Sequence, residues 1–283
     1  MKGLPMFNEE YVRSQATEIR VHIVNMLAQA GSGHPGGSLS AADIVSVLYF
    51  GDVLKHSVDD PQDPTRDRFL LSKGHAAPVQ YAALALAGYF DIEELNHLRT
   101  LGAMLQGHPD ALKTPGIEVS TGSLGQGLSI CCGMAKALKM DASPARVFCL
   151  LGDGELQEGQ VWEAAMFAAH YRLDNLVAIV DHNGLQIDGR CDDVMALGDI
   201  EAKFKAFGWD TVPIDGHDVA ALHRALTDAP QRGKPRVVLA KTIKGCGVSF
   251  MEDIARWHGV TPTAEQACVA CDELRCGCAQ GGR

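Results

Sequence analysis

The chain has 283 residues, of which 46% are hydrophobic and 21% are charged, as is typical of a globular protein with a substantial core. Its formal net charge of −10 argues against nucleic acid or an anionic membrane surface as a partner. No apolar run approaches bilayer-spanning length and residues 1–5 do not resemble a signal peptide, so the nine cysteines indicate reduced thiols in the cytoplasm.

Apolar stretches separated by glycine-rich turns predict alternating helices and strands. In the first half of the chain we expect, in order, a helix over 9–29, a helix from the capping sequence 40–43 to residue 49, a strand over 69–71, helices over 76–86 and 92–101, a loop over 106–122 and a helix over 125–139. In the second half we expect a strand over 147–151, a helix over 155–171, a strand over 176–180, a helix over 199–207, a strand over 209–214, a helix begun by His217 and Asp218, and a strand over 236–241. This order predicts an α/β fold, a doubly wound parallel sheet with helices on both faces.

No linker divides the chain, so we expect residues 1–262 to form one domain, followed by a C-terminal helix and tail over 263–283. Thr263 and Gln266 have the spacing of a capping box, which predicts where this helix begins. A Cys-x-x-Cys pair that begins at Cys268 could suggest a zinc site. The segment has no histidine and its pattern is helical, which favours a fraying terminal helix.

Two oxygen-bearing side chains follow successive predicted strands. Asp153 lies in a Gly-Asp-Gly turn after the strand 147–151, and Asn183 lies in an Asn-Gly turn after the strand 176–180. The helix expected between them would bury a face formed by Trp162, Ala165, Met166 and Ala169. Strand, helix and strand then form a βαβ unit, in which both strands are parallel and end at the same edge of the sheet. Open α/β sheets bind their ligands at this carboxyl edge.

The residue types at this edge suit a hard cation and a phosphate. A carboxylate, an amide oxygen and a backbone carbonyl are ligands of the kind that Mg²⁺ prefers. The glycines beside Asp153 let a phosphate approach the backbone, and the helix that follows presents free N–H groups to it. Because the chain is acidic overall, local groups must hold such an anion.

Besides His217, which is assigned above to the start of a helix, four of the eleven histidines adjoin a glycine, namely His34, His75, His108 and His258. A histidine beside a glycine is sterically open and can donate a hydrogen bond to a ligand. Imidazole supplies such donors without a fixed charge, which an acidic protein needs if it binds anions. For each histidine alone, a solvent-exposed loop position is the alternative.

These motifs together resemble those of a known family. The Gly-Asp-Gly turn at Asp153, followed thirty positions later by Asn183, resembles the signature that binds thiamine diphosphate and magnesium. The string GDGELQEGQVWE over 152–163 resembles transketolases specifically, as do the loops around His34, His75 and His108. The resemblance runs from about residue 8 to 262 and covers only the N-terminal, diphosphate-binding part of that family. It implies the thiamine diphosphate-binding fold.

The resemblance also implies a role for individual residues. Asp153, Asn183 and the carbonyl of Leu185 would hold Mg²⁺. The cofactor's diphosphate would be bound by His75, His258, the backbone N–H of Gly154 and, as a further contact, Lys244. The remaining implied roles are the loop Gly122, Ser123 and Leu124 against the cofactor, His34, His108 and His258 facing the sugar and assisting proton transfer, and Glu158 in a proton network at a subunit interface.

The activity implied by this resemblance is transfer of a two-carbon ketol unit from a ketose phosphate to an aldose phosphate, as in the pentose phosphate pathway. The family activates the cofactor with a glutamate of a separate pyrimidine-binding domain, and no segment here resembles that domain. The chain therefore resembles the N-terminal subunit of a split transketolase. It would need a second copy of itself and a separate C-terminal subunit, as a heterotetramer.

Three alternatives remain at this point. One is the alpha subunit of a 2-oxo-acid dehydrogenase, which is also a separate chain with a Gly-Asp-Gly site. A second is a specialised ketolase that acts on an unusual sugar phosphate. The third is a non-catalytic regulatory domain that binds a nucleotide or a diphosphate.

Overall fold

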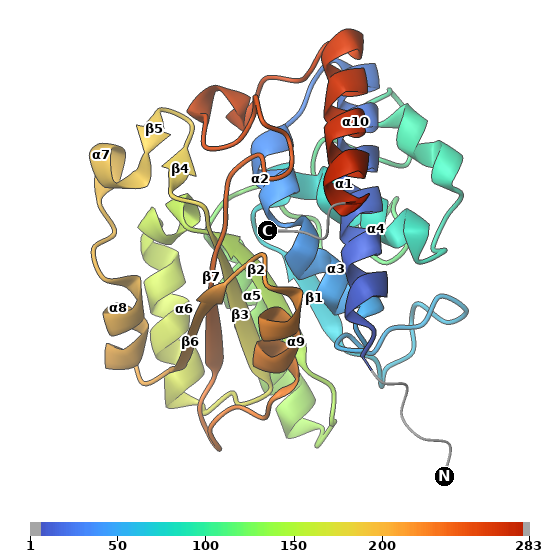
Figure 1. Ribbon diagram of the computed structural model, residues 1–283. Helices are drawn as coiled ribbons and strands as arrows, with labels where there is room; N and C mark the ends of the chain where they lie inside the picture. The colour runs from blue at the N-terminus through green and yellow to red at the C-terminus, as the bar shows by residue number, and fades with distance from the viewer. Residues whose placement is uncertain (1–6, 280–283) are drawn as a thin grey trace.

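The structure, a computed structural model, describes residues 7–279, with side chains described as far as residue 277. Its centre is a five-stranded parallel sheet with the strand order β1-β2-β3-β7-β6 (Figure 1). The strands are β1 (Arg68–Leu71), β2 (Val147–Gly152), β3 (Leu176–His182), β6 (Asp210–Asp215) and β7 (Arg236–Lys241). A short antiparallel hairpin follows β3 and consists of β4 (Leu185–Gln186) and β5 (Gly189–Arg190).

Helices cover both faces of the sheet because the strands are apolar on both sides (Figure 1). On one face, Phe148 and Leu150 of β2 share a core with α1 (Glu9–Ala30), α3 (Ala42–Phe50), α4 (Ala77–Leu86), α9 (Val219–Thr227) and α10 (Ala264–Ala279). On the other face, Cys149 and Leu151 pack with α5 (Gln126–Met140), α6 (Gly159–His170) and α8 (Ile200–Ala206). The predicted doubly wound α/β fold is confirmed.

Short elements surround the carboxyl edge of the sheet. They are α2 (Pro35–Ser40), α7 (Cys191–Met195) and the 3-10 turns η1 (Gly74–Ala76), η3 (Gly154–Gln157) and η4 (Ala255–His258). A further 3-10 turn, η2 (Ile92–His97), packs against α1 and α4.

The predicted βαβ unit is present as β2, α6 and β3. The two strands are adjacent and parallel, and Gly152 pairs in register with Asp181. Asp153 and Asn183 therefore leave the same edge of the sheet, as the sequence predicted.

Two helix predictions need correction. The expected helix over 155–171 is interrupted at Glu158, whose backbone is extended (φ −72°, ψ 125°), so α6 starts only at Gly159. Its buried residues are Val161, Ala164, Ala165 and Ala168, whereas Met166 is 58% exposed. The helix expected over 92–101 is a 3-10 turn that ends at His97, and Arg99 adopts a left-handed backbone conformation (φ 61°) that ends any helix there.

Two capping predictions are also wrong. Ser40 does not cap α3, because its hydroxyl donates 2.6 Å to Asp181 Oδ2 inside the core. His217 does not cap α9, since the N-cap is Asp218, whose side chain accepts from Ala221 N–H at 2.9 Å. In both cases a tertiary contact takes the side chain that local sequence assigned to a helix end.

The C-terminal helix α10 begins with the predicted capping box. Thr263 Oγ1 accepts from Gln266 N–H at 3.2 Å, and Gln266 Oε1 accepts from Thr263 N–H at 3.0 Å. The helix packs along α1 instead of fraying, with Cys271 buried there and Cys268 exposed. Within residues 7–279, no helix is both long and apolar enough to cross a membrane.

Candidate functional site

The carboxyl ends of β2 and β3 bring three oxygen-bearing groups together. Asp153 Oδ1 accepts from Gly154 N–H at 2.8 Å, and Oδ2 accepts from Gly184 N–H at 2.5 Å. Asn183 Oδ1 accepts from the N–H of Leu185 at 3.1 Å. The turn between β3 and β4 thus folds back onto the end of β2, and the polar atoms of Asp153, Asn183 and Leu185 lie in one cluster.

The donor set fits a divalent cation. Asp153 is only 2% exposed, and burial raises the pKa of its carboxyl group, with Asp181 adding to the rise. A cation beside the carboxylate would offset this penalty, and carboxylate, amide and carbonyl oxygens are the ligands that Mg²⁺ takes. The Leu185 carbonyl already attracts a positive charge, because Lys244 Nζ donates to it at 3.0 Å. Burial lowers the pKa of this lysine to about 8.

Three of the predicted histidines form a compact triangle above this edge. The ring centroids of His34, His75 and His258 are 5.1 to 5.4 Å apart, although the residues come from the starts of α2 and η1 and from the end of η4. Burial lowers the pKa of His34 to about 4, of His75 to about 2 and of His258 to about 3, and Lys244 lowers all three further. The rings are therefore neutral at pH 7 and can donate or accept protons.

The hydrogen bonds of the triangle leave free nitrogen atoms. Lys244 Nζ lies 3.0 Å from His258 Nδ1, and since an ammonium only donates, Nδ1 is the acceptor and His258 carries its proton on Nε2. His34 Nδ1 is buried and has no hydrogen-bond partner among the described side chains and backbone. Unpaired nitrogens in a buried cluster are expected where a polar ligand completes the site.

Glycines let the surrounding loops approach the triangle closely. A Cβ on Gly36 would lie 2.9 Å from the carbonyl oxygen of Trp257, the residue before His258, and a Cβ on Gly74 would lie 2.8 Å from Gly122 N. Both distances are too short to be tolerated. Gly122 in turn faces His108, whose Cδ2 would be 3.0 Å from a Cβ at that position. The loop that carries Gly122 is thus held between η1 and His108.

The other predicted residues lie at the rim of this site. His108 and Ser123 are exposed, and Leu124 is half-buried. Glu158 is exposed at the start of α6 and packs its Cβ against Gly125. The structure therefore brings the candidate metal ligands, Lys244 and three of the histidines close together, whereas His108 and Glu158 lie at the periphery.

A buried ion pair in the site was missed in the sequence. Lys73 Nζ lies 2.5 Å from Asp181 Oδ2, and the two side chains are 2% and 0% exposed. Burial alone would raise the pKa of Asp181, but Lys73 holds this pKa below its usual range. Asp181 also accepts from Ser40, Asn183 and Thr242, which joins α2, β3 and β7. In the sequence, Lys73 and Asp181 each follow an apolar strand segment, and this position could have indicated that they belong to the site.

Glu155 is a second missed residue. Its Oε1 accepts from Gly125 N–H at 2.9 Å and from the Ser72 hydroxyl, and its Oε2 accepts from Gly152 N–H at 3.1 Å. One buried carboxylate therefore ties the end of β2 to the loop before α5 and to the segment before η1.

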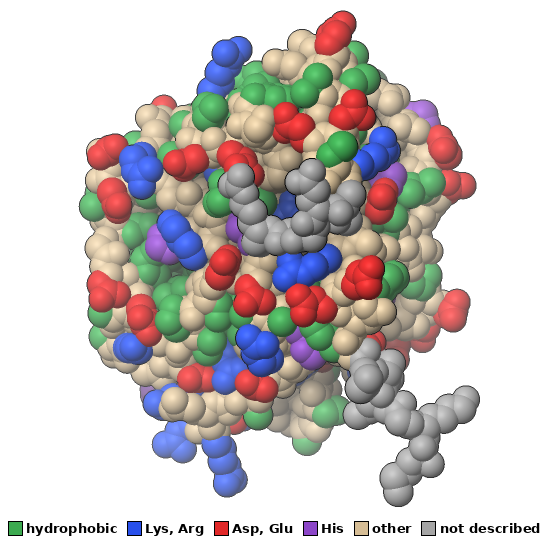
Figure 2. Space-filling model, in the orientation of Figure 1, with side chains coloured by type: hydrophobic (Ala, Val, Ile, Leu, Met, Phe, Trp, Pro, Cys, Tyr) green, Lys and Arg blue, Asp and Glu red, His purple; other side chains and the backbone are tan. Residues whose placement is uncertain are grey.

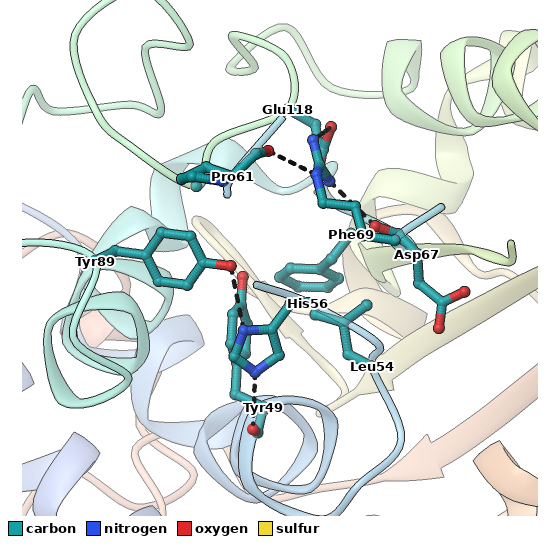
Figure 3. Close-up of a pocket in the computed structure, with 10 residues that line it drawn as sticks. Tyr49, Leu54, His56, Pro61, Asp67, Phe69, Tyr89 and Glu118 are labelled. Atoms are coloured by element: carbon teal, nitrogen blue, oxygen red, sulfur yellow. Dashed lines mark hydrogen bonds and ion pairs between the residues drawn. The ribbon is translucent and has the colours of Figure 1, made fainter. Parts of the chain in front are cut away.

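A small cavity of about 10 Å³ lies at the opposite end of the sheet, near the start of β1 (Figure 3). His56 points into it, with Nδ1 3.1 Å from the Tyr89 hydroxyl and Nε2 3.2 Å from the Tyr49 carbonyl (Figure 3). It has room for about one water molecule at most.

On the face in Figure 2, acidic and basic side chains are interspersed, so a diphosphate would depend on local donors.

Comparison with known proteins identifies the family. Residues 12–274 match the family described as "Transketolase, thiamine diphosphate binding domain". The chain is 45% identical over 264 residues to the 6-deoxy-6-sulfo-D-fructose transketolase subunit SqwG of Clostridium sp. (strain MSTE9), which covers 93% of this chain and 96% of that protein. It is 42% identical over 258 residues to an apulose-4-phosphate transketolase subunit of Phocaeicola vulgatus, covering 91% of each.

Longer transketolases match over part of their length. Human transketolase is 44% identical over 249 residues, which are 88% of this chain but 39% of that protein. The crystal structure of a transketolase variant from Pichia stipitis superposes with a TM-score of 0.88 at 32% identity, covering 96% of this chain and 41% of that one. These relatives do not favour a 2-oxo-acid dehydrogenase or a regulatory domain. The chain belongs to the transketolase family, and it corresponds to the family's thiamine diphosphate-binding domain.

Proposed function

We propose that the chain is the cofactor-binding subunit of a transketolase that moves a two-carbon ketol unit from a ketose phosphate to an aldose phosphate. The observation that carries this proposal is the meeting of Asp153, Asn183 and Leu185 with three neutral histidines at one edge of the sheet. When bound, thiamine diphosphate supplies a nucleophilic carbon and an electron sink for cleavage of the ketose.

The residues of this chain would bind and orient that cofactor. Asp153, Asn183 and the Leu185 carbonyl would hold Mg²⁺, whose charge would offset part of the charge of the diphosphate. His75 and His258 would donate to the diphosphate, and Lys244 would supply a positive charge. The N–H of Gly154, which now pairs with Asp153, would become a further donor once the Asp153 carboxylate binds the metal. The loop formed by Gly122, Ser123 and Leu124 would lie against the cofactor.

The other proposed roles concern protons. His34 is neutral and its Nδ1 is unpaired, so it can accept a proton from a sugar hydroxyl and return it, whereas His258 carries its proton on Nε2 and can donate it. His108 at the rim serves the same purpose nearer the solvent. Glu158, exposed at the start of α6, contributes to a proton network with a second copy of the chain.

A separate C-terminal subunit would complete the enzyme. Two relatives of similar length are named as transketolase subunits, and this chain covers only 39% of human transketolase. The partner would bring the pyrimidine-binding half, in a heterotetramer with two copies of each subunit. The eight cysteines with described side chains are free thiols, which supports a cytoplasmic enzyme.

The substrates are proposed as a class, phosphorylated ketoses and aldoses, such as those of the pentose phosphate pathway. The relatives' names refer to 6-deoxy-6-sulfo-D-fructose and apulose 4-phosphate, so a specialised sugar is compatible with this family.

Reconstitution tests this proposal directly. The chain is mixed with a candidate pyrimidine-binding transketolase subunit, and ketol transfer is measured with a panel of sugar phosphates. We expect turnover that depends on thiamine diphosphate and Mg²⁺, and none from either polypeptide alone. Substantial turnover by the single chain would refute the proposal that a second polypeptide is required.

A further inference from the structure

Four chemically active side chains meet beside the cofactor loop, which we define as residues 242–247. They are Arg20 of α1, Asp43 of α3, His217 ahead of α9 and Cys246 of the loop itself. Arg20 and Asp43 form a buried bidentate ion pair, with Nη1–Oδ1 and Nη2–Oδ2 distances of 3.1 and 2.5 Å. The proposed function uses none of these four residues.

His217 connects the ion pair to the cofactor loop. Its Nδ1 lies 2.7 Å from Asp43 Oδ2, and its Nε2 accepts a 2.9 Å hydrogen bond from Ile243 N–H. A ring nitrogen that accepts from an amide carries no proton, so His217 is protonated on Nδ1 and donates to Asp43. The imidazole therefore anchors the loop one residue before Lys244.

The sulfur of Cys246 lies near the ring of His217, on the loop segment that packs against Arg20. Its Sγ is 3.7 Å from His217 Nδ1. Arg20 is 8% exposed, and its Nε is buried without a hydrogen-bond partner among the described residues. This Nε lies 3.8 Å from where a Cβ on Gly247 would be, beside Cys246. A buried N–H of a cation is costly when unpaired, and a negatively charged sulfur would satisfy it.

We propose that Cys246 is a reactive thiol that hydrogen peroxide oxidises to a sulfenic acid, and that this oxidation controls the cofactor loop. The thiol proton passes to solvent, and the sulfur attacks one peroxide oxygen. An S–O bond forms as the O–O bond breaks, and the departing oxygen takes a proton and leaves as water. The sulfur loses two electrons and the peroxide gains them, which gives one sulfenic acid and one water.

A metal site is the competing use of these side chains, because ligand atoms of Asp43, His217 and Cys246 lie within 4.8 Å of one another. The guanidinium of Arg20, however, already binds both carboxylate oxygens of Asp43. Burial lowers the pKa of Arg20, but the Asp43 carboxylate raises this pKa by more, so the guanidinium stays positively charged. A divalent cation would be repelled by this charge.

Oxidation would alter the hydrogen bonds of the loop. The added oxygen lies between Cys246 and His217 Nδ1 and competes with Asp43 for the proton there. A shift of the imidazole loosens its second bond, to Ile243 N–H, and with it the position of Lys244. This consequence for cofactor binding rests on the proposed function of Lys244, whereas the reactivity of Cys246 does not.

The reactivity is tested on the full chain. Peroxide is added in the presence of dimedone, which traps sulfenic acids, and each cysteine peptide is quantified by mass spectrometry over time. The exposed Cys268 and Cys276 are internal comparators. We expect Cys246, although half-buried, to be labelled on the order of tenfold faster than either. Earlier labelling of the two tail cysteines would overturn the proposal.

Two Arg20 variants test whether the guanidinium causes the reactivity of Cys246. Arg20→Met removes the charge and the Nε donor, and we expect labelling of Cys246 to slow to the rate of the tail cysteines. Arg20→Lys keeps the charge, and we expect an intermediate rate in a folded chain, as judged by circular dichroism. An unchanged rate in Arg20→Lys and Arg20→Met would contradict the role of the guanidinium.

Calorimetry tests control of the loop. Binding of thiamine diphosphate with Mg²⁺ is measured before and after peroxide treatment, for the wild-type chain and for Cys246→Ser. We expect oxidation to weaken binding several-fold in the wild type and to leave Cys246→Ser unaffected. Equal affinity of the oxidised and reduced wild type would overturn control of the loop. If the reduced chains fail to bind, the proposed function fails, while the labelling result stands separately.

Discussion

At the residue scale, the site combines a buried carboxylate with neutral imidazoles. Asp153 is nearly inaccessible, and its charged form is disfavoured by burial. The three clustered histidines carry no charge at pH 7 to compensate for it. A bound cation would therefore supply the missing positive charge for both the carboxylate and a diphosphate, so metal and cofactor binding should depend on each other.

The first prediction concerns Asp153→Ala. We expect Mg²⁺-dependent affinity for thiamine diphosphate to fall at least about 100-fold, because a ligand and its charge are lost. Thermal unfolding of the metal-free chain should change little, because removing the costly buried carboxylate offsets the loss of its hydrogen bonds to Gly154 and Gly184. Calorimetry measures the first effect, with the exposed Asp59→Asn as control. Unchanged affinity of the Asp153 variant would remove this residue from the metal site.

The second prediction concerns the buried ion pair. Lys73→Met leaves Asp181 charged and unpaired, and should lower the free energy of unfolding by about 3–5 kcal/mol. Lys139→Met breaks an ion pair with Asp174 whose side chains are 41% and 32% exposed, and should cost under about 1 kcal/mol. Urea denaturation compares the two variants. Equal effects would mean that the buried pair is not a structural requirement.

The third prediction concerns pH. Burial lowers the pKa of His75 to about 2, whereas in the unfolded chain it is about 6.5. Below about pH 6.5 the unfolded chain takes up a proton that the folded chain does not, so this residue lowers stability as the pH falls. His75→Gln should therefore gain about 2–3 kcal/mol relative to the wild type between pH 7 and 4.5. A pH-independent difference in unfolding free energy would contradict this.

At the element scale, apolar runs bounded by glycine located the strands well because both faces of the sheet are covered. The strand predicted over 236–241 coincides with β7, and the ends of β2 and β3 lie where the Gly-Asp-Gly and Asn-Gly turns predicted. The helix ends were less predictable. The expected helix is broken at Glu158 because the preceding turn η3 places Glu155 at the end of β2. There Glu155 contacts Ser72, which is far away in the sequence.

The site itself was predicted in part. Residues that carry a local motif, such as Asp153, Asn183 and three of the glycine-flanked histidines, were predicted as candidates, and the structure brings them to one edge of the sheet. Lys73 and Glu155 were not, because their importance comes from partners that only the folded chain brings close. Ser40 and His217 were assigned to helix ends for the same reason.

The capping box of α10 supplies the fourth prediction. Thr263→Ala removes the acceptor for Gln266 N–H and should destabilise the helix by about 1 kcal/mol. Because α10 packs along α1, its amides should then exchange with deuterium about fivefold faster, as mass spectrometry can measure. Thr100→Ala, at an exposed position outside the helix, serves as control. Equal exchange in both variants would show that the cap does not limit this helix.

At the scale of the whole molecule, the outer surface of α6 is more apolar than an isolated chain needs. Met166 is 58% exposed, Phe167 38% and Tyr171 42%, on the helix that Glu158 precedes. Large exposed apolar side chains gathered on one element are typical of an interface. In the proposed heterotetramer they would lie against a second copy of this chain.

The fifth prediction tests that surface. Met166→Lys should weaken association of the assembled enzyme, because a charge would be buried at the interface, and should leave the fold of the separate chain intact. Sedimentation velocity of the reconstituted complex measures the effect. Val269→Lys, at a 50% exposed position on α10 in the other helix layer, is the matched control. Equal sedimentation of both variants would exclude Met166 from the interface.

The contact between Lys244 and the Leu185 carbonyl has a consequence for how the cofactor enters. A divalent ion bound to this carbonyl would repel the ammonium from it, and Lys244 would then be free to bind the diphosphate. Cofactor loading would therefore exchange one cation for another: the ammonium of Lys244 would move from the Leu185 carbonyl to a diphosphate oxygen, and the metal ion would bind the carbonyl in its place.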